Sequence, residues 1–255
     1  DGKQLCLGNA PNLTWRHLVQ VGYDVTQLSD NVLCNDDDDC IEPGARCSGP
    51  VGSPFKFCLT VLSIVDEDSK VLIHAGASGV GTAAIQLAKL YEAQTVFVTA
   101  SKAKHEVCQS LGADVAIDYK KDDFVERIKE LTNGEGVDMI LDFVGADYFQ
   151  KNLECLAVDG QMVMLAFLGG FKVPNANLIP IISKRLMISG VTIRNQSRFF
   201  KEARTEKLKE LLLYFITGEL KPVIDSVYDW TAVRQAHQHM ENNQNIGKII
   251  LKIQD

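Results

Sequence analysis

The stretch Val71-Leu-Ile-His-Ala-Gly-Ala-Ser-Gly-Val-Gly-Thr-Ala-Ala-Ile-Gln-Leu-Ala-Lys89 decides how the rest of the chain is interpreted. Its apolar start leads into three glycines, Gly76, Gly79 and Gly81, and an apolar-periodic helix follows without a break. Glycines let the backbone approach a phosphate closely, and a helix N-terminus offers free N–H groups and a partial positive charge. The order of strand, glycine turn and helix therefore predicts a cradle for a pyrophosphate.

The composition is that of a globular protein. The chain has 255 residues, of which 46% are apolar and 23% are charged, and its formal net charge is −7. This acidic balance argues against a general affinity for nucleic acid or for a membrane surface. No apolar run reaches the roughly 20 residues that a membrane-spanning helix needs. Residue 1 is Asp rather than Met, so we expect a fragment or a processed chain.

Beyond residue 69, apolar runs alternate with amphipathic stretches. The runs are almost continuously apolar, as strands are in a parallel sheet that helices cover on both faces. Six such strands predict an α/β fold with a doubly wound parallel sheet, the Rossmann fold. The predicted strands are 70–74, 95–99, 115–117, 137–142, 161–166 and 186–193. The predicted helices between them are 79–91, 102–111, 122–132, 148–156 and 178–184.

Three further elements follow the sixth predicted strand. They are a long amphipathic helix at 199–217, a helix at 231–240 and an apolar strand at 246–253. We therefore expect residues 66–255 to form a nucleotide-binding Rossmann domain with a C-terminal helix-strand extension.

Residues 1–65 have a different character, because five of the seven cysteines fall in the first 58 residues. An acidic run, Asp36–Asp39, lies between two of them. Three interpretations stay open for this Cys/Asp-rich segment. The first is a small disulfide framework, which needs an oxidising compartment. The second is a zinc site. The third is an irregular and poorly ordered leader with reduced thiols. CxxC spacing is absent and no histidine stands close to the cysteines, which argues against the zinc site, and we favour the Asp-rich leader.

The residues after the second predicted strand indicate which nucleotide binds. Proteins that bind NAD place Asp or Glu there, about 20 residues after the glycine turn, for the ribose hydroxyls. This chain has Thr99-Ala-Ser-Lys-Ala-Lys104, with two lysines and no acid. Tyr119, after the third strand, adds a hydroxyl. The alternative is that Lys102 and Lys104 are ordinary surface lysines, but cations are slightly unfavourable at a helix start. The pattern favours the 2′-phosphate of NADP.

These residues resemble the nucleotide-binding domain of the medium-chain dehydrogenase/reductase superfamily. They are more closely similar to zeta-crystallin-like NADPH:quinone oxidoreductases, over about residues 66–254. The matching pieces are the segment 71–88, Leu111-Gly-Ala113, Tyr119-Lys-Lys121, Gly136-Val-Asp138, Leu141-Asp142, Lys151-Asn152, Cys155-Leu-Ala157, Asp159-Gly160 and Asn245-Ile-Gly-Lys-Ile249.

The resemblance implies NADPH as the cofactor. It maps the pyrophosphate contacts to Gly76, Ala77, Ser78, Gly79, Val80 and Gly81. It maps the 2′-phosphate contacts to Lys104 and Tyr119, in agreement with the charge argument. It maps the nicotinamide side to Val144, Gly145, Phe167, Leu168, Gly169, Thr192 and Ile193. It also implies a quinone or enone as the small-molecule substrate, a cytoplasmic location, no catalytic zinc, and a homodimer formed by pairing of the strand 186–193.

In that family a GroES-like β domain precedes the Rossmann unit and forms the other wall of the cleft, and residues 1–60 do not look like it. Two functional hypotheses follow. The first is a reductase that transfers hydride from NADPH to quinones or conjugated carbonyls, with no catalytic side chain assigned. The second is a truncated, non-catalytic NADPH-binding module. Among the remaining groups, we expect His74 to bond to nearby backbone and Cys108 and Cys155 to be packed.

Overall fold

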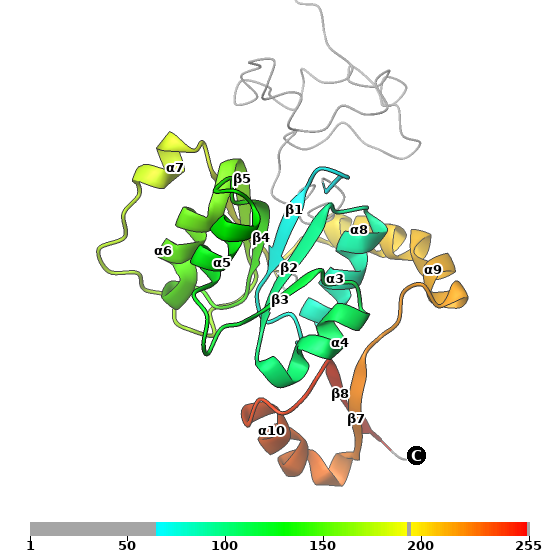
Figure 1. Ribbon diagram of the computed structural model, residues 1–255. Helices are drawn as coiled ribbons and strands as arrows, with labels where there is room; N and C mark the ends of the chain where they lie inside the picture. The colour runs from blue at the N-terminus through cyan, green and yellow to red at the C-terminus, as the bar shows by residue number, and fades with distance from the viewer. Residues whose placement is uncertain (1–64, 193–194, 254–255) are drawn as a thin grey trace, which may run out of the picture. The chain divides into compact units, whose positions relative to one another are not determined.

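The computed structural model describes residues 65–192 and 195–253 (Figure 1). The predicted Cys/Asp-rich segment, residues 1–64, lies outside the described residues, and so do its three interpretations.

The described chain is built on one six-stranded sheet in which every neighbouring pair is parallel. Its order, β3-β2-β1-β4-β5-β6, is that of the doubly wound dinucleotide-binding fold, so the predicted Rossmann fold is confirmed. The strands are β1 (Lys70–Ile73), β2 (Thr95–Ala100), β3 (Val115–Asp118), β4 (Val137–Asp142), β5 (Leu156–Met164) and β6 (Met187–Gly190).

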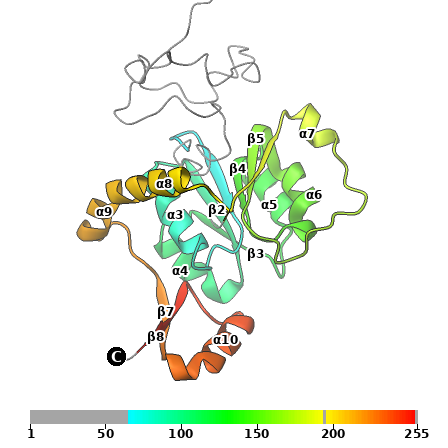
Figure 2. The ribbon, with the colours of Figure 1, turned by 180° about the vertical axis from the view of Figure 1, so that it is seen from behind.

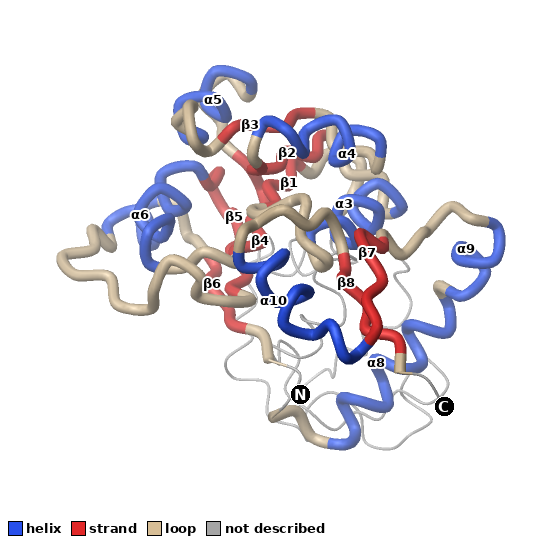
Figure 3. Tube along the Cα trace, turned by 90° about the horizontal axis from the view of Figure 1, so that it is seen from below, coloured by secondary structure: helices blue, strands red, loops and turns tan. Residues whose placement is uncertain are grey.

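Helices cover both faces of this sheet. The helices α3 and α4 lie on one face and α5 and α6 on the other (Figures 1 and 3). The helices of this part are α3 (Gly81–Leu90), η4 (Lys102–Lys104), α4 (His105–Ser110), α5 (Phe124–Leu131), α6 (Ala146–Cys155) and α7 (Ile179–Ser183). Because both faces are covered, β1 buries Val71, Leu72 and Ile73 in succession, and its sequence is continuously apolar.

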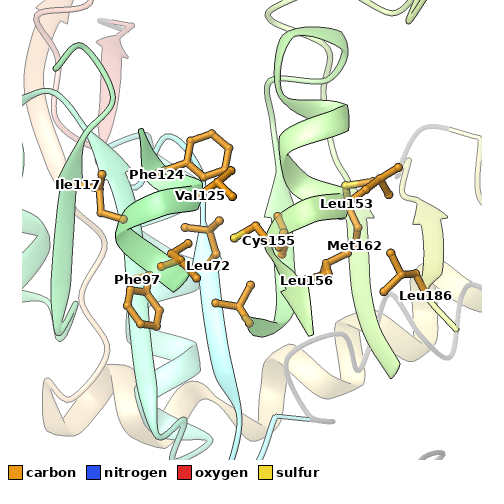
Figure 4. Packing of buried hydrophobic residues seen from close by; sticks show 13 residues of the cluster. Leu72, Phe97, Ile117, Phe124, Val125, Leu153, Cys155, Leu156, Met162 and Leu186 are labelled. Atoms are coloured by element: carbon orange, nitrogen blue, oxygen red, sulfur yellow. The ribbon is translucent and has the colours of Figure 1, made fainter. Parts of the chain in front are cut away.

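The main apolar cluster lies between the sheet and the pair α5 and α6. Leu72 and Phe97 come from β1 and β2, Phe124 from α5 and Leu153 from α6, and all four are almost fully buried (Figure 4). Burying one such side chain contributes about 1.5–3 kcal/mol. This cluster fixes the strands whose carboxyl ends carry the predicted site residues.

The largest differences from the predicted boundaries concern three elements. The predicted helix 199–217 is two helices, α8 (Arg198–Glu210) and α9 (Leu212–Thr217), the second ending at the left-handed Gly218. The strand β5 starts at Leu156 rather than at 161, and the predicted turn residue Asp159 lies inside it with a φ of 63°. The strand β6 spans four residues of the predicted eight.

The C-terminal extension is a small unit of its own. Its strands β7 (Ile224–Asp229) and β8 (Lys248–Lys252) pair in parallel, and η5 (Trp230–Ala232) and α10 (Val233–Glu241) connect them. Figure 2 shows the strand pair and α10 together, below α4. The predicted strand 246–253 is thus confirmed in a shorter form.

Candidate nucleotide-binding site

The glycine turn lies where the strand order of the sheet reverses. The backbone N–H of Gly76 donates to the carbonyl of Thr99 on β2 (3.0 Å), and the N–H of His74 donates to the carbonyl of Leu141 on β4 (3.1 Å). The turn is therefore tied to the strands on both sides of β1. In open parallel sheets, ligands bind beyond the carboxyl ends of the strands at this reversal.

The two ends of the glycine turn pack closely against each other, as the predicted phosphate cradle requires. A Cβ at Gly81 would lie 2.4 Å from the carbonyl oxygen of Ala75, so only glycine fits there. Ala75 itself has a left-handed φ of 48°. Such strained backbone is concentrated at binding sites, where the surrounding structure holds it in place.

The start of α3 is open to an anion. Val80 at its N-cap makes no side-chain cap bond, and the first turn contains no acidic residue. The hydroxyl of Ser78 accepts from the N–H of Gly81 at 3.0 Å. The positive end of the helix is thus not neutralised by a carboxylate, and a pyrophosphate fits the residues that are present.

Asn243 links Lys104 and Tyr119, the two residues predicted to contact the 2′-phosphate. The Lys104 ammonium donates to Asn243 Oδ1 and to the carbonyl of Asn245, both at 2.8 Å. Asn243 Nδ2 donates to the Tyr119 hydroxyl at 3.3 Å. Lys104 is only 8% exposed, so it is not an ordinary surface lysine. Burial, the largest effect, lowers the pKa of Lys104, while the charge of Asp225 raises it.

Asp225 holds the loop that carries these asparagines. Its carboxylate accepts from the backbone N–H of Ile246 and pairs with His239 Nε2, each at 2.8 Å. Burial alone would raise the pKa of Asp225, but the hydrogen bonds from Ile246, Ser226 and His239 outweigh it and the pKa is lowered. The loop 242–247 is therefore anchored by an ionised carboxylate.

The same loop also contacts the glycine turn. The backbone N–H of Gly247 donates to the carbonyl of Ala77 at 2.8 Å. The aliphatic chain of Lys248 crosses Gly79 so closely that a Cβ there would lie 2.4 Å from Lys248 Cδ. Sequence reasoning did not assign a role to Asn243 or Lys248. The only signal was the segment 245–249, which matched the family and contains Lys248 but not Asn243.

Five of the seven residues predicted for the nicotinamide side lie in two loops, one after β4 and one after β5. The backbone N–H of Gly169 donates to the carbonyl of Val144 at 2.7 Å. Gly145 has a φ of 82°, and a Cβ there would lie 2.8 Å from Phe167 Cδ1. Leu168 is 79% exposed. Five of the predicted residues, listed here together, are thus neighbours: Val144, Gly145, Phe167, Leu168 and Gly169.

The last two predicted residues follow β6. Thr192 is exposed, directly after Val191, whose N–H donates to the carbonyl of Met164 on β5 at 3.0 Å. Ile193 lies outside the described residues. The structure therefore places Thr192 at the carboxyl edge of the sheet and describes no contact for Ile193.

The expectation for His74 was wrong in its partners. Its ring nitrogens bond to two side chains, Thr99 Oγ1 at 3.0 Å and Asn152 Oδ1 at 2.8 Å, rather than to backbone. The ring is fully buried, and burial lowers the pKa of His74 to about 4, so the ring is neutral at pH 7. It is part of the core behind the turn. Cys108 and Cys155 are buried and free, as predicted.

Two findings concern metals and membranes. Within residues 65–192 and 195–253, no three His, Cys, Asp or Glu side chains gather where they could hold a metal ion. Over the same residues, no helix combines the length and the apolar character needed to cross a bilayer.

Comparison with known protein families shows which family this chain belongs to. Residues 79–209, about half of the chain, match the sequence family described as zinc-binding dehydrogenase. The chain belongs to the medium-chain dehydrogenase/reductase superfamily. Its quinone oxidoreductase-like branch, which the sequence predicted, is also supported by the solved structures described next.

Relatives within the superfamily carry different names. The synaptic vesicle membrane protein VAT-1 homolog of Rattus norvegicus is 31% identical over 195 residues, which are 71% of this chain and 48% of that protein. The quinone oxidoreductase of Escherichia coli, solved with NADPH, has a TM-score of 0.67 at 27% identity, covering 81% of this chain and 65% of that one. An NAD-dependent alcohol dehydrogenase has a TM-score of 0.67 at 27% identity, covering 82% of this chain and 58% of that one.

The chain spans about half the length of the curated relatives it matches, for example 48% of the rat protein. Its membership makes it part of an oxidoreductase superfamily whose members work with nicotinamide cofactors. Since the similar structures include both an NADPH complex and an NAD-dependent enzyme, the choice between the two cofactors depends on the residues of this chain.

Proposed function

We propose that this chain binds NADPH and is the cofactor-binding part of an NADPH-dependent oxidoreductase acting on quinones or conjugated carbonyls. The pyrophosphate is assigned to the turn 76–81 and the 2′-phosphate to Lys104 and Tyr119. The nicotinamide side is assigned to the loops after β4 and β5 together with 192–193. Lys248, whose stem crosses Gly79, adds a cation beside the pyrophosphate.

One observation carries the choice of NADPH. The cation Lys104 and the hydroxyl of Tyr119 are linked through Asn243, and the segment after β2 contains no acid that would bind ribose hydroxyls. A cation and a hydroxyl recognise a phosphate by charge-assisted hydrogen bonds.

Bound in this way, the nicotinamide ring supplies a hydride to the acceptor. The residues of this chain bind and orient, and the exposed apolar side chains of Phe167 and Leu168 offer an apolar surface to an aromatic or conjugated acceptor. No side chain is assigned to proton transfer.

The first prediction tests the cofactor. We expect Lys104→Ala to raise the Kd for NADPH roughly 10- to 100-fold and to leave the Kd for NADH within about twofold, because only NADPH carries the 2′-phosphate. Isothermal titration calorimetry with both dinucleotides measures this. The matched control is Lys102→Ala, which removes an exposed lysine from the same turn. Equal losses in the two variants, or equal losses for the two dinucleotides, would contradict the proposal.

The second candidate function is an NADPH-binding module without turnover. It is favoured by the described site, whose residues bind and orient and in which no side chain is assigned to proton transfer. Oxidation of NADPH in the presence of a quinone, followed by absorbance, separates the two candidates. Tight binding without oxidation supports the module, and oxidation that Lys104→Ala abolishes supports the reductase.

Two further proposals follow from the family. The chain forms a homodimer through β6, which pairs only with β5 among the described strands. It works in the cytoplasm, a location that a cell-fractionation experiment with the tagged chain tests directly.

A further inference from the structure

The loop 242–247 connects α10 to β8, and it also contacts three parts of the candidate nucleotide site. It bonds to Lys104 through Asn243 and Asn245, to Tyr119 through Asn243, and to the glycine turn through Gly247. Asn243 stands 139 residues beyond Lys104 along the chain. The sequence around it gave no reason to assign it a role.

The orientation of the Asn243 amide follows from chemistry. A lysine ammonium has three donors and no acceptor, so the amide oxygen of Asn243 must face Lys104. The amide nitrogen then faces the Tyr119 hydroxyl, at 3.3 Å, and donates to it. Since the hydroxyl oxygen accepts this bond, its own proton remains available for another acceptor.

The number of hydrogen-bond donors on Lys104 likewise indicates that its ammonium can bind another acceptor. Its ammonium uses two N–H groups, one on Asn243 Oδ1 and one on the carbonyl of Asn245. Among residues 65–192 and 195–253 no other acceptor is bonded to it, so the third N–H is left for a further acceptor. A phosphate has only acceptor oxygens at its binding surface, and it therefore matches a pair of groups that each present one remaining donor.

We infer that Asn243 is a positioning residue of the 2′-phosphate site, whose amide holds the Lys104 ammonium and the Tyr119 hydroxyl as donors and so favours NADPH over NADH. This inference rests on the proposed function and adds a residue to it. Asn243 touches the two contact residues and acts on the phosphate through them.

The surrounding bonds make Asn243 suitable for this role. Asn243 has a left-handed φ of 53°, which Asn adopts more readily than most residues. Asn245 Nδ2 donates to the carbonyl of Gly247 at 3.1 Å, and Asp225 accepts from the N–H of Ile246. The N–H of Asn243 itself donates to the carbonyl of Met240 at 2.9 Å, so the loop is held on both sides of the amide, which is fixed against the lysine before a ligand binds.

The decisive variant is Asn243→Asp, which keeps the size and the left-handed backbone of the residue. A carboxylate accepts from Lys104 as the amide does, so the chain is expected to fold. It also accepts the proton of Tyr119, and it places a negative charge beside the phosphate. We expect the Kd for NADPH to rise at least about tenfold and the Kd for NADH to change less than about twofold.

Two more variants complete the series. Asn243→Gly fits the left-handed backbone and deletes the amide, so it is expected to weaken NADPH about three- to tenfold without the charge effect. Asn242→Asp is the matched control, because it adds the same charge one residue away, on an exposed side chain for which the described residues show no bond to Lys104 or Tyr119. It is expected to change both affinities by less than about twofold.

The measurements are titrations of the full chain with NADPH, NADH and 2′,5′-ADP, with thermal unfolding of each variant as the folding check. The weakening for 2′,5′-ADP should follow that for NADPH, because both carry the 2′-phosphate. Equal weakening by Asn243→Asp and Asn242→Asp, or equal weakening of NADPH and NADH, overturns the inference.

The same measurements distinguish a failure of this inference from a failure of the proposed function. If Lys104→Ala lowers NADPH affinity selectively and Asn243→Asp does not, the NADPH site stands and the role of Asn243 is wrong. If Lys104→Ala leaves the ratio of the two affinities unchanged, or the wild-type chain binds neither dinucleotide, the proposed cofactor fails and the inference fails with it.

Discussion

His74 shows how a single buried residue supports the turn that follows it. Its ring bonds to Thr99 on β2 and to Asn152 on α6, and it packs edge-on against Phe124 at a centroid distance of 4.9 Å. Three elements thus meet at the residue before the left-handed Ala75. Since burial lowers the pKa of His74 to about 4, these contacts belong to the neutral ring.

The second prediction concerns the pH dependence of stability. A histidine whose pKa is lowered on folding destabilises the native state below its unfolded pKa of about 6.5, because the unfolded chain takes up a proton that the native chain does not. The loss grows as the pH falls from about 6.5 to about 4 and reaches about 2 kcal/mol near pH 5. Urea unfolding near pH 7 and near pH 5 measures it.

The control for this prediction is His74→Gln, which is neutral at both pH values. The variant is less stable at pH 7, because one of the two side-chain bonds is lost, but its stability should fall less between the two pH values. A fall as large as that of the wild type would show that other groups cause the pH dependence.

Among the elements, α5 shows how one carboxylate can serve two helices. Asp123 at its N-cap accepts from the N–H of Val125 at 2.9 Å and pairs with Lys151 on α6 at 2.7 Å. The hydrogen bond from Lys151 is the largest cause of the lowered pKa of Asp123. The predicted helix 122–132 starts with two aspartates, and in the structure the second of them, Asp123, is the N-cap.

The third prediction follows from this cap. Asp123→Ala is expected to lower the free energy of unfolding by about 1–2 kcal/mol, about 1 from the cap and less than 1 from the exposed ion pair. Asp122→Ala, beside it, is expected to change stability by less than about 0.5 kcal/mol. Urea unfolding of both variants at pH 7 measures the difference, and equal effects would rule out a specific cap.

At the same scale, the sequence predicted the elements better than their boundaries. The glycine turn, the six strands of the main sheet and the helices between them depend on residues close together in the chain, and they were predicted, whereas β7 was not. The break between α8 and α9 at Leu211 has no Gly or Pro to signal it. The early start of β5 follows from pairing with β4, where the register shifts between Val137 and Met139, and a local pattern does not contain that pairing.

Part of the candidate site was predicted from the sequence, and part of it was not. Lys104 and Tyr119 follow strands directly, so the order of strands and the position of the turn were enough to assign them. Asn243 and Lys248 reach the site from the C-terminal extension, and their contacts depend on the path of the chain in space. No spacing rule connects residues 139 positions apart.

For the whole molecule, the edge strand β6 is where we propose that two copies of the chain pair. This strand lies at the edge of the sheet, and a flat edge strand offers unpaired N–H and C=O groups to a second copy. Gly190, at its end, has space around it, since a Cβ there would meet no atom within 4 Å.

The fourth prediction tests this edge. Gly190→Lys adds a charge that disfavours edge pairing and leaves the single chain intact, because the space is open. Light scattering over a range of concentrations is expected to show a dimer for the wild type and a monomer for the variant. Gln109→Lys, which adds the same charge on the exposed side of α4, should remain a dimer. A monomeric wild type would remove the proposal.

The bond between Gly247 and Ala77 has a consequence for how such chains change their cofactor over evolutionary time. The glycine fingerprint and all six strands of the sheet are complete before residue 191, yet the partners of Lys104 come from residues 243 and 245. With Lys104 as the proposed 2′-phosphate contact, exchange or truncation of the tail would alter the preference for a dinucleotide while every hallmark of the fold stayed in place. On that proposal, a designer who grafts this Rossmann unit onto another protein must carry its last strand along, or the graft will keep the fold and lose the proposed selectivity.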